Sequence, residues 1–230
     1  MNNRGDPQSR LHGARYTARK GLIGSFMYFV VAGVVYFFSD TATLYPTTSL
    51  GAIAVFFLLG WARFLLTYKF EFFYPPSPQR WYRLYTLTML STGYLWGSLC
   101  ALAFYLHNGE WLAFLMGFAT AGLASGATLS ISPMIGMQRL YIAGMLLPSA
   151  LVNYWQTGPE ALAVAILFSM QFLFLWIVGY HLYSEYWTAV DNTILLAERA
   201  HDLEDARGRA EAAAEAKSRF LANMSHEIRT

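Results

Sequence analysis

The chain has 230 residues, of which 13% are charged, 56% are hydrophobic and 17% are aromatic, and its formal net charge is +2. Soluble domains carry about 25% charged residues, so this composition excludes an ordinary soluble domain and indicates a membrane protein. The single cysteine, Cys100, excludes a disulfide within the chain.

The first predicted element is a polar and basic N-terminal tail, residues 1–20. The apolar stretch that follows lacks the small-residue cleavage pattern of a signal peptide near Asp40. We therefore expect the first apolar stretch to remain in the protein as a membrane-spanning helix.

Between residues 21 and 183, the sequence contains six apolar stretches of spanning length. They are residues 21–38, 49–66, 84–106, 111–131, 140–155 and 161–183. About 20 helical residues cross the hydrocarbon core of a bilayer. Lipid cannot satisfy an exposed backbone, and no alternation typical of barrel strands is present. The sequence thus predicts an all-α, polytopic membrane protein with a six-helix transmembrane bundle over residues 21–183.

The basic residues predict the orientation of this bundle. Lysine and arginine precede the first span, lie between the second and third and between the fourth and fifth, and follow the sixth. The loops at residues 39–48, 107–110 and 156–160 contain neither. By the positive-inside rule, both termini are expected in the cytoplasm. The three outer loops are too short to fold a sensor domain, so a stimulus would have to act within the bundle.

The fourth span is rich in small residues, and both it and the third span contain a GxxxG pair, Gly122 with Gly126 and Gly93 with Gly97. Small residues allow close approach of helices, so we favour tight packing of the third and fourth spans. The alternative is a ligand cavity. The polar Gln171 in the sixth span would form an interhelical hydrogen bond or contact the same ligand. The candidate ligand residues are Thr120, Ser125, Gly126, Thr128 and Gln171.

Two other kinds of site are not predicted. No paired histidine spacing suggests a metal site. The aromatic and basic inner loop at residues 68–83 could in principle contact nucleic acid, but beside six spans it is better interpreted as lying at the lipid headgroups, so no nucleic-acid partner is expected.

After residue 183 the composition changes to alanine, glutamate and arginine, which predicts a cytoplasmic signalling helix over residues 184–219. Imperfect heptad rows predict a weak parallel dimeric coiled coil, and a solvated single helix is the alternative. One row contains Leu196, Leu203, Ala210, Lys217 and Met224.

The final segment, residues 220–230, carries the most specific motif. The apolar residues Phe220, Leu221 and Met224 lead into Ser225-His226-Glu227, followed by Ile228-Arg229-Thr230. This pattern resembles the phospho-acceptor box of sensor histidine kinases of the hybrid, two-component type. In that family a proline normally follows, so we expect the chain to be the start of a longer kinase, truncated within its dimerisation and phospho-acceptor helix.

The resemblance implies a role for each residue of the box. His226 would be the phospho-acceptor, since a neutral imidazole nitrogen can attack the γ-phosphate of ATP. Glu227 would assist as a hydrogen-bond acceptor or base. Thr230 lies one helical turn after His226 and would orient water during dephosphorylation.

The resemblance also implies cofactors, partners and location. The full-length kinase would use ATP and Mg²⁺, and the present chain, without an ATP-binding domain, would not be catalytic alone. The expected partners are a second copy of the chain, membrane lipids, the missing ATP-binding domain, a receiver or response regulator and a hydrophobic or small-molecule signal. The expected location is the inner membrane of a bacterium.

Three alternative functions remain open at this stage. Within the same kinase class, the bundle could be a receptor for a lipid-like quorum signal. A small transporter or channel is disfavoured because charged residues at mid-span and an inverted repeat are both lacking. A passive membrane dimerisation anchor is the third.

Overall fold

The computed structural model describes residues 7–229, and the side chains of residues 7–10, 23, 216, 218–223 and 225–229 are outside that description. The described chain consists of nine helices and contains no strand. They are α1 (Pro7–Gly24), α2 (Met27–Phe38), α3 (Thr41–Leu44), α4 (Pro46–Tyr68), α5 (Phe70–Phe73), α6 (Pro78–Leu106), α7 (Trp111–Ser130), α8 (Ile135–Trp155) and α9 (Pro159–Arg229).

Six helical segments are long and apolar enough to cross a membrane. The first combines α1 and α2, and the others are α4, α6, α7, α8 and the first part of α9. The predicted all-α fold with six spanning helices and a long C-terminal helix is therefore confirmed. Many large apolar side chains point away from the protein, for example Leu58 and Leu167, each 65% exposed. Such exposure suits a lipid environment, because in water it would be unfavourable.

The first helix begins well before the expected start of the first span at residue 21. Pro7 stands at the start of α1, where a proline is tolerated because its missing N–H has no intrahelical partner. Ala14, Thr17 and Ala18 are buried along one face of α1. The polar N-terminal tail predicted from the sequence is therefore largely a helix that packs on the bundle. A hydropathy profile does not reveal this buried face, because charged residues occupy the rest of the helix surface.

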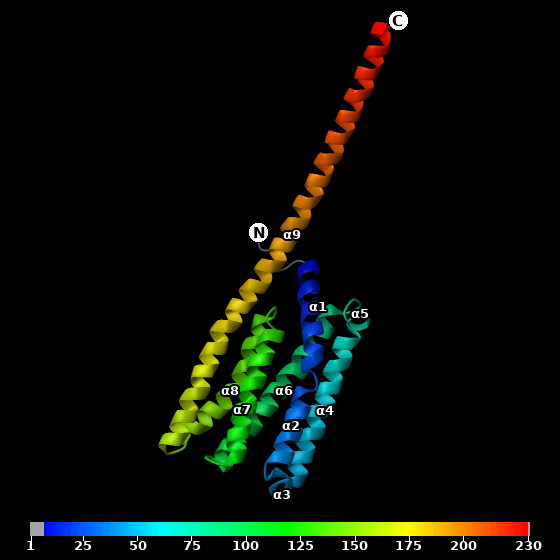
Figure 1. Cartoon of the computed structure of the whole chain (residues 1–230). Coiled ribbons are helices and arrows are strands. Elements are labelled where there is room, and N and C mark those ends of the chain that lie inside the picture. The colour runs from blue at the N-terminus through cyan, green and yellow to red at the C-terminus, as the bar shows by residue number, and fades with distance from the viewer. Residues whose placement is uncertain (1–6, 230) are drawn as a thin grey trace. The chain divides into compact units, whose positions relative to one another are not determined.

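The chain divides into two compact units at the boundary between Tyr186 and Trp187, which lies within α9. In the first unit, α1 and α2 follow one another alongside α4, and α6 lies against both α4 and α8 (Figure 1). Helix α7 contacts α6, α8 and the α1–α2 segment. The second unit consists of the remainder of α9.

The ends of the helices form two groups. The short helix α3, the α6–α7 turn and the α8–α9 turn lie at one end of the first unit, and α5 and the α7–α8 turn lie at the other (Figure 1). The first group contains the three loops without lysine or arginine. Hydrogen bonds join segments there: Trp111 Nε1 donates to the Phe38 carbonyl over 2.8 Å, and Asn108 Nδ2 donates to Gln156 Oε1 over 2.6 Å.

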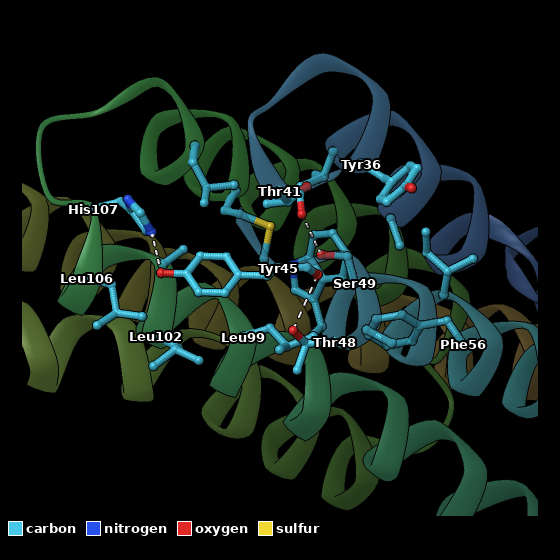
Figure 2. A pocket seen from close by; sticks show the side chains of 18 residues that line it. Tyr36, Thr41, Tyr45, Thr48, Ser49, Phe56, Leu99, Leu102, Leu106 and His107 are labelled. Atoms are coloured by element: carbon cyan, nitrogen blue, oxygen red, sulfur yellow. Dashed lines mark hydrogen bonds between the residues drawn. The ribbon is translucent and has the colours of Figure 1, made fainter. Parts of the chain in front are cut away.

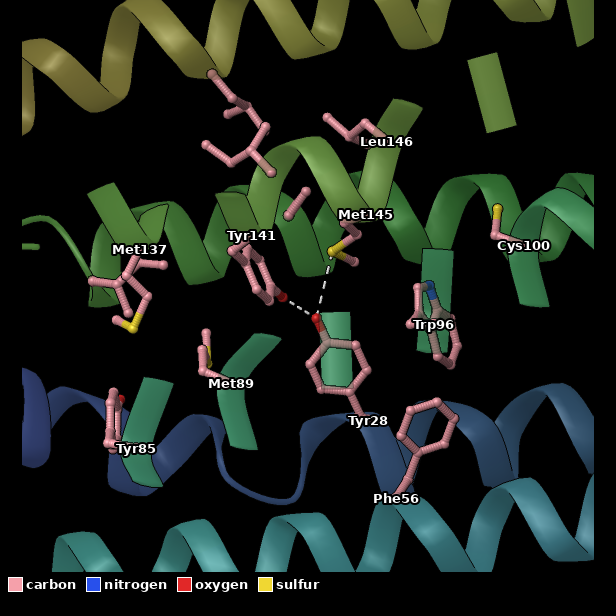
Figure 3. Close-up of a cluster of buried hydrophobic side chains, with 14 of the residues drawn as sticks. Tyr28, Phe56, Tyr85, Met89, Trp96, Cys100, Met137, Tyr141, Met145 and Leu146 are labelled. Carbon is pink, nitrogen blue, oxygen red and sulfur yellow. Dashed lines mark hydrogen bonds between the residues drawn. The ribbon is translucent and has the colours of Figure 1, made fainter. Parts of the chain in front are cut away.

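The core of the first unit is aromatic (Figure 3). Tyr28 of α2 stacks on Phe56 of α4, with ring centroids 5.7 Å apart, and meets Trp96 of α6 edge-on at 5.6 Å. The Tyr28 hydroxyl hydrogen-bonds the Tyr141 hydroxyl of α8 and donates to Met145 Sδ at 3.4 Å. These contacts join four helices through one tyrosine.

Candidate functional site

The segment that resembles a phospho-acceptor box, residues 220–230, is called the histidine box, and it lies at the end of α9. Helix α9 runs without interruption from Pro159 to Arg229, so His226 and Glu227 are on a continuous helix, as the sequence predicts. Their side chains and the whole of Thr230 are outside the described part of the structure. The expected placement of the box on a helix is confirmed, and the chemical roles of its residues stay predictions.

In the single chain, the two leucines of the predicted heptad row are exposed. Leu196 is 65% exposed and Leu203 is 71% exposed. Elsewhere on this helix, Arg207 and Glu211 form an ion pair of 2.7 Å at the i, i+4 spacing. Exposed leucines at heptad spacing between charged residues are typical of a helix that pairs with another.

Two of the predicted ligand residues point into the packed core. Thr120 is fully buried, and its Oγ1 accepts a hydrogen bond from Trp96 Nε1 at 2.9 Å and donates to the Met116 carbonyl at 2.6 Å. Thr128 is also buried, and its hydroxyl donates to the Ala124 carbonyl at 2.8 Å. The Thr120 hydroxyl thus joins α6 to α7, and the Thr128 hydroxyl is satisfied within its own helix.

The other three predicted ligand residues lie elsewhere. Ser125 is exposed and donates to the Ala121 carbonyl within its own helix at 2.8 Å. Gln171 donates through Nε2 to the same Ala121 carbonyl at 3.2 Å, which is the interhelical hydrogen bond that the sequence suggested. Gly126 lines a cavity near the end of α7. The structure therefore does not bring the five candidates together in one site.

The two glycine pairs also have different surroundings. A Cβ atom on Gly97 would lie 2.3 Å from the Gly144 carbonyl oxygen, and one on Gly93 would meet the Tyr141 ring at 2.7 Å. Helix α6, the third span, thus packs closely on α8, the fifth span, through Gly93 and Gly97. At Gly122 and Gly126 an added Cβ would meet nothing within 4 Å. The expectation that this second pair joins the third and fourth spans is wrong, because both glycines border open space.

One cavity, of about 390 Å³, lies toward the end of the bundle that carries α3 (Figure 2). Helices α2, α3, α4, α6 and α7 line it, chiefly with apolar side chains. At its rim the Tyr45 hydroxyl lies 3.4 Å from His107 Nε2, and His107 Nδ1 lies 2.7 Å from Glu110 Oε2. A cavity of this size and lining would suit a small hydrophobic molecule.

A second cavity, of about 950 Å³, lies between α1, α2, α7 and the part of α9 before residue 187. Its wall includes Gly122 and Gly126, which explains the open space next to these glycines. The charged residues Lys20, Arg63 and Glu185 also line it. In this inner cavity, charged and apolar side chains meet.

Arg63 is the residue whose position sequence reasoning missed. The sequence places it near the end of the second span, where it contributes to the positive-inside pattern and could extend toward water. In the structure it is only 3% exposed and turns inward, toward the break between α1 and α2. The sequence did contain a sign of this burial, because Arg63 stands five residues before the end of an otherwise apolar helix.

No family model matches this chain, and no solved structure matches it. Among the described residues, no group of three or more histidine, cysteine, aspartate or glutamate side chains could hold a metal ion. A functional conclusion therefore rests on the fold, the cavities and the motif on α9.

Proposed function

We propose that this chain is the membrane input part of a sensor histidine kinase and that it relays a stimulus from the bundle to His226. The observation that carries the proposal is the continuity of α9, which begins in the last membrane-spanning segment and ends just after the histidine box. A change in how this helix packs within the bundle needs no additional domain to reach His226.

The proposed chemistry is phosphoryl transfer from ATP. An imidazole nitrogen of His226 attacks the γ-phosphorus, the bond between this phosphorus and the β,γ-bridging oxygen breaks, and ADP leaves. Glu227 accepts a hydrogen bond or the proton of the imidazole as the phosphoramidate forms. ATP and Mg²⁺ would be held by an ATP-binding domain, and the phosphoryl group would pass on to a receiver domain or response regulator.

The stimulus in this proposal is a hydrophobic small molecule that enters the bundle. The cavity beside α3 supports it, because apolar side chains from several helices surround a volume in the range of small-ligand sites. Occupation of this cavity would act on α6 and α7, and Phe104 of α6 already contacts Phe168 of α9 edge-on at 5.6 Å. A shift of α6 would therefore change the surroundings of α9.

A pair of insertions tests the relay through α9. Two alanines inserted after Ala200, in the protein extended to its ATP-binding domain, would rotate the following residues by about 200°, whereas seven would leave them within about 20° of their original face. We expect the shorter insertion to change autophosphorylation about tenfold, which corresponds to a shift of about 1.4 kcal/mol in the signalling equilibrium.

The seven-residue insertion is the matched control and should retain nearly normal activity. Autophosphorylation is measured with labelled ATP in membranes that contain equal amounts of each variant. Equal activity for both insertions would contradict a relay that depends on the face of α9.

The proposal also places both termini in the cytoplasm, and cysteine labelling tests this. A cysteine at Leu44 or Thr157 should react with an impermeant reagent in intact cells, whereas one at Ser77 or Gly136 should not. Thr157 is preferable to Gly158, whose φ of 124° disfavours a side chain. The buried Cys100 is replaced by alanine to remove background. Labelling at Ser77 in sealed cells would overturn this topology.

A further inference from the structure

Arg63 of α4 is a buried cation held by neutral groups. Its Nη2 donates to the carbonyl oxygens of Gly24 and Ser25, at 2.7 and 2.9 Å, and its Nη1 donates to Met89 Sδ at 3.1 Å. Its Nε is buried and has no hydrogen-bond partner. Within the described residues, no carboxylate forms an ion pair with this guanidinium.

The carbonyl groups compensate the charge only in part. Gly24 and Ser25 stand at the C-terminal end of α1, where the aligned peptide dipoles are equivalent to about half a negative charge. A guanidinium carries a full positive charge, and burial of a charge that is only partly compensated is unfavourable. An anion next to Arg63 would therefore stabilise the bundle as well as bind to it.

The inner cavity lies beside Arg63 and has a polar and an apolar end. Lys20 of α1, Ser132 after the end of α7 and Glu185 of α9 are among the polar residues that line it, and Val31 and Phe118 are among the apolar ones. The α1–α2 segment and α7 run in opposite directions, so Lys20 and Ser132 lie toward one end of the cavity, and Val31 and Phe118 lie toward the other. Such a gradient matches a molecule with a charged head and a hydrocarbon chain.

The depth and the opening of the cavity indicate a molecule of the bilayer. Arg63 stands five residues before the end of α4 at Tyr68, or about 7–8 Å along the helix axis. The apolar face of a surface helix reaches a similar depth, about 5–10 Å, at the boundary between headgroups and acyl chains. Phe118 and Leu129, which are 75% and 58% exposed, line the cavity, so its wall reaches the lipid-facing surface of the bundle.

We propose that the inner cavity binds an anionic phospholipid, with its phosphate on Arg63 and one acyl chain along α7. The Nε–H of Arg63, which has no partner in the protein, can donate a charge-assisted hydrogen bond to a phosphate oxygen. Gly122 and Gly126 leave the space next to α7 that the chain would occupy. This proposal does not depend on the kinase reaction, because its test measures lipid binding.

The test measures lipid binding to the purified 230-residue chain by native mass spectrometry, with phosphatidylglycerol and phosphatidylcholine of identical acyl chains. We expect one phosphatidylglycerol to bind about tenfold more tightly than phosphatidylcholine, because both lipids carry the phosphate but only phosphatidylcholine adds a cation, which Arg63 and Lys20 repel. Arg63→Met should remove this preference. Gly126→Leu should weaken phosphatidylglycerol binding by a similar factor, because Gly126 lines the cavity and an added Cβ meets no protein atom within 4 Å.

Gly51→Leu is the matched control, since Gly51 is exposed on α4, has nothing within 4 Å and lines neither cavity described above. It should bind phosphatidylglycerol normally. Because Arg63→Met also removes the link to the α1–α2 break, the Gly126 variant decides the matter if the arginine variant fails to fold.

Three outcomes would overturn the proposal. Equal affinity for both lipids would mean that the site does not select an anion. Unchanged phosphatidylglycerol binding in Gly126→Leu would place the lipid outside the cavity and leave Arg63 as a link between helices. Displacement of phosphatidylglycerol by equimolar glycerol phosphate would identify the ligand as a soluble phosphate.

Discussion

His226→Gln is expected to reduce autophosphorylation to background in the protein extended to its ATP-binding domain. Glutamine has an amide nitrogen that is not nucleophilic, so no phosphoramidate can form at this position. The measurement is acid-labile phosphate on the chain after incubation with labelled ATP. The Thr230→Ala variant is expected to be phosphorylated normally and to lose the phosphate more slowly, because alanine would orient the attacking water less well than threonine.

His201→Gln is the matched control for this substitution. His201 lies on the same helix, outside the histidine box, and is exposed. Its Nε2 is 3.9 Å from Asp205 Oδ2. Its replacement should leave phosphorylation within the error of the assay. Acid-labile phosphate that persists in His226→Gln but disappears in His201→Gln would move the acceptor to position 201 and refute the assignment of the box.

Gly97→Leu is expected to destabilise the bundle strongly. A Cβ atom at this position would lie 2.3 Å from the Gly144 carbonyl oxygen and 2.8 Å from Met145 Cα. Both are backbone atoms, so α6 and α8 would have to separate. Overpacking in a core costs about 1–3 kcal/mol where side chains can adjust, and a rigid backbone contact leaves less room for adjustment.

Thermal unfolding of the detergent-solubilised protein, followed by loss of the monodisperse peak in size-exclusion chromatography, measures this effect. Gly51→Leu provides the comparison, because the same side chain there points away from the protein. Its unfolding temperature should be close to that of the unmodified protein. A Gly97→Leu protein as stable as Gly51→Leu would show that the α6–α8 contact does not hold the bundle together.

The sequence alone determined the membrane character, the number of spanning helices and the place of the histidine box. Each rests on a local property. Apolar stretches of sufficient length must become helices in lipid, wherever their neighbours lie. The distribution of lysine and arginine divides the loops into two groups, and the structure places these groups at opposite ends of the first unit. The box is a contiguous motif, so it needs no tertiary information.

Only the tertiary structure decided which faces of the helices meet. The pairs Gly93–Gly97 and Gly122–Gly126 have the same spacing, yet one lies against α8 and the other borders a cavity. Spacing places two residues on one face of a helix and does not say what the face contacts. For the same reason, Arg63 in a hydropathy profile is only a charge near the end of a span. Its burial depends on the break between α1 and α2, whose free carbonyl groups accept its hydrogen bonds.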